Sequence, residues 1–340
     1  MNKKHVDFAL LGALLAVMLA LFGSCSTEDG NGGFGNIWGG SSQPPVFIES
    51  RPVSETEIDF KFSVPVKLTS LQFSPAKEVS SIEHGSTVRV TLSENLGMGV
   101  ALAADLLAED EYGNTINVLV SFRSRNTRVP DLLINELRTE FASAQSRTEF
   151  IEFRMKSDGN LGALRVFAAS NSRNPMIYEF PPVEVKKGEL VVLHLRTLDP
   201  YLSRDELGDN LDESGGRYAS PTARDLWIPG STKLLRRTDA VYVLDQDDRV
   251  LTAVMISENP GSQWQRDYFR SAAEFLFSQG AWKSPDGNVA SPSGAVSTSG
   301  ITATRSVSRD ETAANTNTAA DWFVTGTGGA TPGRDNIARP

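Results

Sequence analysis

The sequence predicts an all-β protein built from two β-sandwiches in tandem, the second with loop insertions and one helix. Short runs alternate apolar and polar residues, which is the period of a half-buried strand. Turn-forming Gly, Asn and Asp residues separate these runs at short intervals, as in a sandwich. The chain has 340 residues, 316 of them from Cys25 onward, which is about twice the length of a typical domain.

The first 24 residues have the composition of an export signal. Lys3 and Lys4 make a short basic start, residues 8–22 are apolar, and two small residues precede Cys25. The apolar run has 15 residues, whereas a helix needs about 20 to cross a bilayer. We therefore expect residues 1–24 to be removed as a signal peptide.

Phe22-Gly23-Ser24-Cys25 resembles the lipobox of bacterial lipoproteins, and Cys25 is the only cysteine of the chain. The resemblance implies a diacylglycerol on the Cys25 sulfur and a further acyl chain, such as palmitate, on the freed amino group. Because each buried CH₂ contributes about 0.8 kcal/mol, such chains hold a protein on a membrane. This predicts a cell-envelope location, with the outer membrane or cell surface favoured over the periplasmic face. An ordinary signal peptide or an uncleaved anchor stays open.

Composition excludes several classes of chemistry. No cysteine follows Cys25, so the mature chain has no internal disulfide, thiolate metal site or catalytic thiol. The net charge of −9 becomes −10 without residues 1–24, because 31 basic and 41 acidic residues remain. The cluster of Lys233, Arg236 and Arg237 is too small to bind the phosphates of a nucleic-acid strand. Nucleic acid is therefore disfavoured as the main ligand, and so is a polybasic contact with the membrane surface.

Residues 25–45 are rich in Gly, Ser and Asn and predict a flexible tether. From residue 46 the chain alternates: Ile58, Phe60, Phe62 and Val64 are expected on one face of a strand and charged residues on the other. Runs at 88–92 and 118–122 repeat the pattern, separated by turn signals at 83–86 and 112–114. This predicts a first sandwich over residues 46–126.

Two motifs of this first sandwich resemble bacterial Ig-like domains of surface proteins. The segment 62–66 (Phe-Ser-Val-Pro-Val) matches a motif that follows their second strand, and 109–114 (Glu-Asp-Glu-Tyr-Gly-Asn) matches the turn before their last strand. The resemblance implies an Ig-like spacer. A polar joint at 123–130 is expected to separate it from the next domain.

Residues 131–337 predict a second sandwich, with strands expected at 132–137, 149–153, 164–168, 190–195, 241–244, 250–256, 301–307 and 322–325. Several segments occur in the order typical of the lamin-tail domain family: Ile134-Asn135-Glu136, 149–153 (Glu-Phe-Ile-Glu-Phe), 187–193, 239–245, Arg309, Asp321-Trp322 and 331–336 (Thr-Pro-Gly-Arg-Asp-Asn). This domain resembles that family, which implies an Ig-like sandwich.

Two insertions make this domain longer than the family norm. Residues 199–236 are acidic and Gly-rich, and residues 257–298 hold the only strong helical pattern. Apolar residues recur there at helical spacing, which predicts a helix across one end of the sandwich. They are Trp264, Tyr268, Ala272, Phe275 and Leu276. Ser262 is the expected N-cap and Gly280 the expected terminator.

Histidine and glutamate positions limit catalytic interpretations. His84 falls in a turn and His194 in an apolar strand, so a core histidine is favoured over a Ser-His-Asp triad. Glu136, Glu149 and Glu152 lie on neighbouring predicted strands, where paired carboxylates for glycoside hydrolysis must be considered. We expect them instead to be outward polar residues of the sandwich.

The carboxylates of the acidic insertion make calcium a candidate ligand. Five carboxylates are available: Asp205, Glu206, Asp209, Asp212 and Glu213. Leu207 and Leu211, however, break the alternation that calcium loops require. We expect a solvated polar loop and no cofactor, with calcium left as the alternative.

The two insertions also hold most of the aromatic rings able to anchor a partner: Tyr218, Trp227, Trp264, Tyr268 and Trp282. The sequence therefore predicts a non-enzymatic binding or structural module whose partner is a protein or an envelope polymer. The competing class is an exported hydrolase or a nuclease-associated accessory protein, because lamin-tail domains also occur beside exported nucleases. If these insertions form the binding surface, deletion of residues 203–222 should leave the fold nearly intact and abolish binding. The alternative is that the helix only caps the core.

Overall fold

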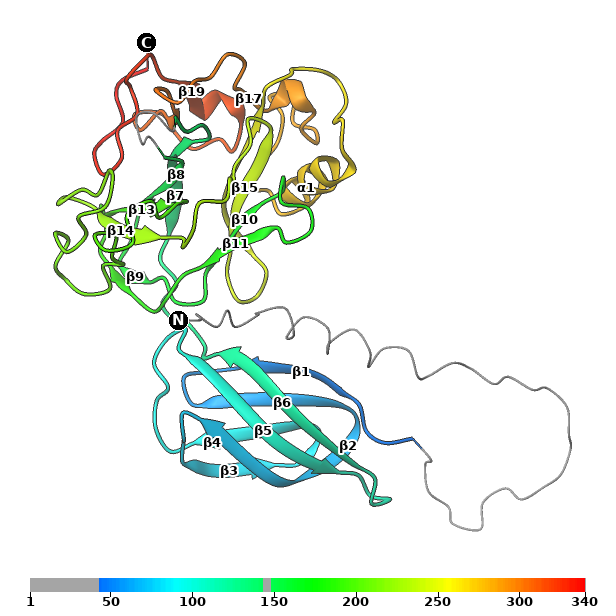
Figure 1. Cartoon of the computed structure of the whole chain (residues 1–340). Coiled ribbons are helices and arrows are strands. Elements are labelled where there is room, and N and C mark those ends of the chain that lie inside the picture. The colour runs from blue at the N-terminus through cyan, green and yellow to red at the C-terminus, as the bar shows by residue number, and fades with distance from the viewer. Residues whose placement is uncertain (1–42, 143–147, 340) are drawn as a thin grey trace, which may run out of the picture. The chain divides into compact units, whose positions relative to one another are not determined.

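The computed structural model describes residues 43–142 and 148–339. Within these ranges the protein is mostly β-structure with a single α-helix (Figure 1). Cys25, the expected signal peptide and most of the expected tether lie outside the described residues. The lipidation and signal-peptide predictions therefore stay predictions.

The first β region is a sheet of six antiparallel strands in the order β3-β4-β2-β5-β6, with β1 paired to β2. The strands are β1 (Phe47–Pro52), β2 (Glu57–Ser74), β3 (Val79–Glu83), β4 (Gly85–Leu92), β5 (Ala101–Glu109) and β6 (Thr115–Arg123). The β5–β6 turn forms where predicted: Gly113 has φ +83° and the Asp110 carboxylate accepts hydrogen bonds from the Tyr112 and Asn114 N–H groups, both at 2.9 Å.

Strand β2 is long and pairs with two groups of neighbouring strands. Its first part pairs with β1 and β4, and its second part pairs with β5. The register with β4 shifts between Lys61 and Val66, as expected where a strand bends from one layer into another. Ile58, Phe60 and Phe62 are buried as predicted, but Val64 lies in this irregular stretch and is 38% exposed. The predicted inward position of Val64 is wrong for that reason.

The joint after β6 is ordered by hydrogen bonds. Asn126 is buried, and its side-chain amide donates to the backbone carbonyls of Asn160 at 2.7 Å and Gly162 at 2.9 Å. Arg125 pairs with Asp247 through Nη1 and Oδ1 at 2.9 Å. The polar residues of the joint therefore bind specific partners, which the composition of the joint did not indicate.

The second β region contains two larger sheets and one short pair. One sheet has the order β14-β13-β8-β7-β18-β19, another β11-β10-β15-β16-β17, and β9 pairs with β12. The strands are β7 (Leu132–Arg138), β8 (Phe150–Met155), β9 (Gly159–Asn160), β10 (Arg165–Ala168), β11 (Met176–Glu179), β12 (Glu184–Val185), β13 (Leu190–His194), β14 (Arg224–Trp227), β15 (Asp239–Leu244), β16 (Val250–Ser257), β17 (Val296–Ser297), β18 (Val307–Arg309) and β19 (Trp322–Val324).

Both larger sheets contribute to one apolar core. Leu137, Ile151 and Leu193 come from the first sheet, and Val241 and Val254 come from the second. All five side chains are fully buried. The pairings are antiparallel except β13 with β14 and β16 with β17, which are parallel.

Most predicted strands form near their expected positions, and two differences are informative. The strand expected at 301–307 begins only at Val307, because residues 303–304 form a turn. Strand β14 lies inside the segment expected to be a loop insertion, where it pairs with β13.

Helix α1 (Asp267–Ser278) confirms the predicted helix, and Phe269, Ala272, Ala273 and Leu276 form its buried face. It starts later than expected, so Trp264 precedes it and the N-cap is Arg266, without a side-chain cap, instead of Ser262. Gly280 ends the helix as predicted: its φ is +67°, and the Ala281 N–H returns to the Leu276 carbonyl at 2.9 Å.

Candidate functional site

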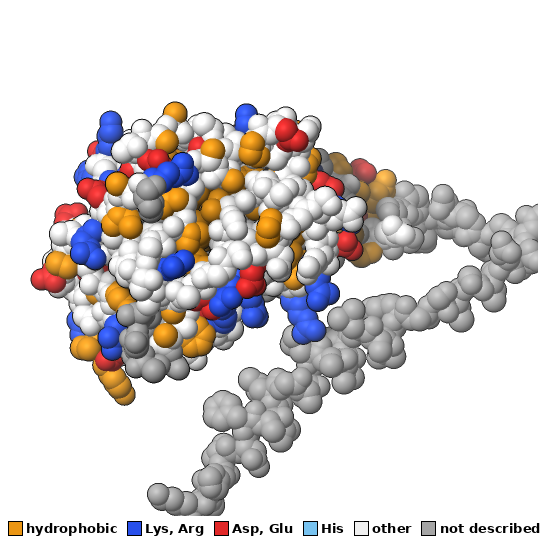
Figure 2. Space-filling model, turned by 90° about the horizontal axis from the view of Figure 1, so that it is seen from above, with side chains coloured by type: hydrophobic (Ala, Val, Ile, Leu, Met, Phe, Trp, Pro, Cys, Tyr) orange, Lys and Arg blue, Asp and Glu red, His pale blue; other side chains and the backbone are white. Residues whose placement is uncertain are grey.

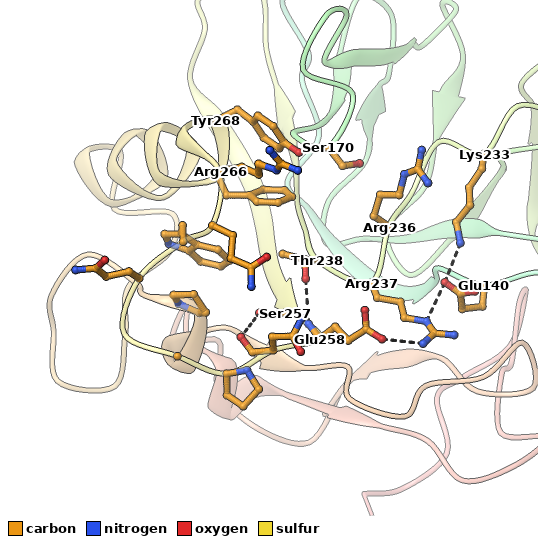
Figure 3. A pocket seen from close by; sticks show the side chains of 18 residues that line it. Glu140, Ser170, Lys233, Arg236, Arg237, Thr238, Ser257, Glu258, Arg266 and Tyr268 are labelled. Carbon is orange, nitrogen blue, oxygen red and sulfur yellow. Dashed lines mark hydrogen bonds and ion pairs between the residues drawn. The ribbon is translucent and has the colours of Figure 1, made fainter.

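An open cavity of about 610 Å³ lies in the second β region beside the start of α1. We call it the α1 cavity. The loop 233–238 forms one wall and the segment 257–269 forms the other, and Glu140, Ser170 and Pro292 complete the lining (Figure 3). This size is typical of a site for a small ligand or for one unit of a larger ligand.

The hairpin of β15 and β16 brings the two walls together. The loop 233–238 leads into β15 and the other wall leaves β16, and the register pairs Asp239 with Ile256. Thr238 Oγ1 accepts a hydrogen bond from the Glu258 N–H at 3.1 Å. The walls are therefore neighbours although the segments are about 20 residues apart in sequence.

Asp239 holds the loop wall in place. This fully buried carboxylate accepts hydrogen bonds from the Ser170 hydroxyl at 2.5 Å, the Ser170 N–H at 3.0 Å and the Arg236 N–H at 3.1 Å. Burial raises the pKa of Asp239 to about 6, and these hydrogen bonds oppose the rise. The backbone next to Arg236 is thus fixed from inside the protein.

Basic side chains outnumber acidic ones in the cavity. Glu140 pairs with Lys233 at 2.8 Å and with Arg237 at 3.2 Å, and Arg237 also pairs with Glu258 at 2.8 Å. The hydrogen bond to Glu258 is the main cause that raises the pKa of Arg237 above its usual value. Arg236 and Arg266 also line the cavity and have no ion pair among the described residues.

Aromatic rings form the wall beside α1. Trp264 is half-buried and its Nε1 donates to the Ala290 carbonyl at 2.8 Å. Tyr268 is also half-buried. Phe269 is 7% exposed and lies 5.8 Å from the Trp264 ring and 4.5 Å from the Tyr268 ring. The two accessible rings are therefore held by a buried third ring.

The other predicted aromatic anchors do not form a surface. Trp282 is 1% exposed and Trp227 is 6% exposed, so both are core residues. Tyr218 is half-buried, and its ring covers the Arg138 guanidinium at 4.9 Å. The structure thus separates the five rings, and only Trp264 and Tyr268 reach the α1 cavity.

The prediction that Glu136, Glu149 and Glu152 are outward polar residues of the sandwich is wrong about their exposure to solvent. All three have 0% exposure. Glu149 pairs with Arg196, Nε to Oε2 at 2.5 Å. Glu136 and Glu152 lie opposite each other on β7 and β8, on the face of the sheet turned away from the shared core. Residues 203–222 of the acidic insertion and the C-terminal segment, residues 331–336, cover this face. The polar residues on it are therefore buried.

The C-terminal segment is bound to these two carboxylates. Glu136 accepts hydrogen bonds from the Ser306 hydroxyl at 2.5 Å and the Thr331 N–H at 3.0 Å, and Glu152 accepts one from the Gly333 N–H at 2.7 Å. Burial raises the pKa of Glu136, and it raises the pKa of Glu152 to about 8, with the Glu136 charge adding to the effect. Buried in this way, the pair has no access to a saccharide.

His194 is the buried core histidine that the sequence favours. Its Nε2 lies 2.7 Å from Asp225 Oδ1, and its ring stacks on Trp227 with centroids 3.8 Å apart. Both His194 and Asp225 have 0% exposure, and His194 Nδ1 has no hydrogen-bond partner in the described ranges. His84 is exposed in the β3–β4 turn and accepts a hydrogen bond from the Leu68 N–H at 3.3 Å.

The acidic insertion is only partly a solvated loop. Asp205 Oδ1 accepts from the Trp227 N–H, and Glu206 Oε2 from the Asp225 N–H, both at 2.7 Å. Glu206 is fully buried, whereas Asp209, Asp212 and Glu213 are exposed. Across residues 43–142 and 148–339, no three His, Cys, Asp or Glu side chains lie close enough to hold a metal ion.

The basic residues of the α1 cavity carry little signal in the sequence. Lys233, Arg236 and Arg237 looked like a small solvated cluster, and Arg266 carried no signal. On the face drawn in Figure 2, basic and acidic side chains are interspersed with scattered hydrophobic ones. Only the pairing of β15 with β16 reveals that four basic residues share one cavity.

A family model described as the TP_1001 protein second domain matches residues 130–324. The chain belongs to this family. An uncharacterized protein of Treponema pallidum (strain Nichols) is 30% identical over 210 residues, which cover 58% of this chain and 51% of the relative. The chain therefore spans about half the length of that relative. The matched region contains the α1 cavity.

In the described part of the chain no helix combines the length and the apolar character needed to cross a bilayer.

Proposed function

We propose that this protein is a cell-envelope lipoprotein that acts by binding and not by catalysis. In this proposal Cys25 carries the lipid, the first β region is an Ig-like spacer, and the second is a lamin-tail-like Ig sandwich that holds its ligand in the α1 cavity. The partner is an envelope component. The observation that supports it is the cavity itself, where Arg236 and Arg266, which form no ion pair within residues 43–142 and 148–339, lie beside accessible, rigidly held rings.

The burial of the candidate catalytic groups also supports binding. Glu136, Glu149, Glu152 and His194 are all fully buried, and each has partners within the protein. A general acid or base must reach the substrate directly or through one water molecule. These four residues stabilise the fold instead.

The test is cosedimentation of purified residues 26–340, which lack the expected signal peptide and the lipid site at Cys25, with isolated envelope material. We expect the wild type to bind and a Trp264→Ala, Tyr268→Ala double variant to lose binding while keeping its melting temperature within a few degrees. Tyr201→Ala removes a ring that is 88% exposed in the insertion and serves as the matched control. Equal binding by all three proteins would contradict the proposal. Turnover in a panel of nuclease and glycosidase substrates would favour the hydrolase alternative.

A further inference from the structure

The α1 cavity has uncompensated positive charge, although the whole chain has a net charge of −9. Four basic residues line it against the two carboxylates of Glu140 and Glu258. Those carboxylates are already bound to Lys233 and Arg237. Arg236 and Arg266 therefore keep guanidinium donors available, one on each wall of the cavity (Figure 3).

A guanidinium group binds carboxylates and phosphates through paired hydrogen bonds, and it keeps its charge at any physiological pH. Arg236 and Arg266 are both exposed, so a ligand reaches them without rearrangement of the core. The charge of the cavity thus points to an anionic ligand.

Amide side chains supply the second kind of contact. Asn259, Gln263 and Gln265 line the cavity and are exposed. No side-chain hydrogen bond engages these three amides among the described residues. An amide offers a donor and an acceptor together, which suits neighbouring hydroxyl groups.

The rings of Trp264 and Tyr268 supply the third kind of contact, a flat apolar wall. Phe269 and the hydrogen bond from Trp264 to Ala290 fix that wall before a ligand arrives. Preorganised aromatic surface binds the apolar face of a ring with little loss of entropy. A simple inorganic anion would make no use of it.

Taking the three kinds of contact together, and resting on the proposed binding function, we propose that the α1 cavity binds a sugar ring bearing an anionic group, either a carboxylate or a phosphate. Arg236 and Arg266 bind the anionic group, the amides bind hydroxyls, and Trp264 and Tyr268 cover the ring. The cavity volume of about 610 Å³ accommodates one or two such rings.

The experiment is calorimetric titration of the full chain with four probes: glucuronate, glucose 6-phosphate, glucose and inorganic phosphate. At least one of the two anionic sugars is expected to bind at least about tenfold more tightly than either glucose or inorganic phosphate, since charged hydrogen bonds add to ring contacts. Comparison of glucuronate with glucose 6-phosphate identifies the preferred anion. Binding should weaken as salt is raised, because both arginines are exposed.

Variants separate the contributions. The Arg236→Gln, Arg266→Gln double variant is expected to bind the preferred anionic sugar no more tightly than glucose. Tyr268→Ala is expected to weaken that sugar about tenfold, with Tyr268→Phe retaining it. Arg173→Gln changes an exposed arginine outside the cavity and should have no effect.

Three outcomes would overturn the inference: glucose binding as tightly as both anionic sugars, inorganic phosphate binding as tightly as glucose 6-phosphate with glucuronate not binding, or Arg173→Gln causing the same loss as the double variant. If no probe binds but cosedimentation still depends on Trp264 and Tyr268, the ligand class is wrong and the binding function stands. If cosedimentation is also insensitive to these rings, the binding function fails too.

Discussion

The buried pair of Glu136 and Glu152 makes the stability of the protein depend on pH in an unusual direction. Both carboxylates accept hydrogen bonds from the C-terminal segment, and both have 0% exposure. Burial holds the pKa of Glu152 at about 8 in the folded protein, against 4.5 for an ordinary glutamate. Between these two values the folded state keeps a proton that the unfolded state releases.

The consequence is a loss of stability as pH rises. A group with a raised folded-state pKa contributes fully below its unfolded pKa, and this contribution falls as pH approaches the folded pKa. The steepest slope for one group is about 1.4 kcal/mol per pH unit, so Glu152 changes the free energy of unfolding by up to about 5 kcal/mol between pH 4.5 and 8. The raised pKa values of Glu136 and Asp239 act in the same direction. We therefore expect the protein to be most stable near pH 5.

Glu152→Gln should remove most of this slope. The variant keeps the shape of the side chain and cannot ionise. Its NH₂ group, however, points at a hydrogen-bond donor that a carboxylate oxygen accepts from in the wild type, which costs about 1 to 2 kcal/mol at pH 5. At pH 8 the cost disappears or becomes a gain, because no buried charge forms. Urea unfolding at pH 5, 6, 7 and 8 measures both free-energy profiles.

The control for this series is Glu274→Gln on the exposed face of α1, which should leave the pH profile unchanged. A wild-type protein that is more stable at pH 8 than at pH 5 would refute the reasoning. So would an unchanged slope in Glu152→Gln, since another group would then be responsible.

Four further predictions follow from other parts of the molecule. Asp239→Asn should lower the free energy of unfolding by about 3 kcal/mol, measured by urea denaturation, because the buried hydrogen bonds to Ser170 and Arg236 lose their acceptor. Deletion of residues 203–222 should abolish cooperative melting, since this segment binds β14 through buried Glu206; an unchanged melting curve would restore the expectation of a dispensable loop. Cys25→Ala should move the protein from the detergent phase to the aqueous phase, and continued membrane association would indicate an uncleaved anchor. A chain of residues 131–340 should fold alone with a cooperative melt by circular dichroism, and a molten profile would mean that contacts such as those of Asn126 are essential.

Local patterns in the sequence determined most of the secondary structure. Alternation in β2 and β4 placed Phe60 and Val90 on a buried face, because successive strand residues point to opposite sides. Gly113 and Gly280 marked a turn and a helix end, since glycine accepts positive φ at little cost. The spacing of apolar residues predicted α1, although the first turn of the helix was placed too early.

What alternation leaves undecided is which face of a sheet meets solvent. Glu136, Glu152 and His194 occupy the face opposite the shared core, where a two-layer sandwich would leave them exposed. In this protein residues 203–222 and 331–336 cover that face through hydrogen bonds. Burial then depends on segments that are distant along the chain, which no local pattern specifies.

The candidate site shows the same division. The sequence by itself identified Trp264 and Tyr268 as aromatic residues in an insertion, but it gave equal weight to Trp227 and Trp282, which are core residues. It also contains Arg236 and Arg266 with nothing to connect them. The β15–β16 pairing sets their walls side by side, because backbone hydrogen bonds of a hairpin fix the positions of both flanking segments. The strands were thus determined by local periodicity, and the cavity was determined by how those strands pair.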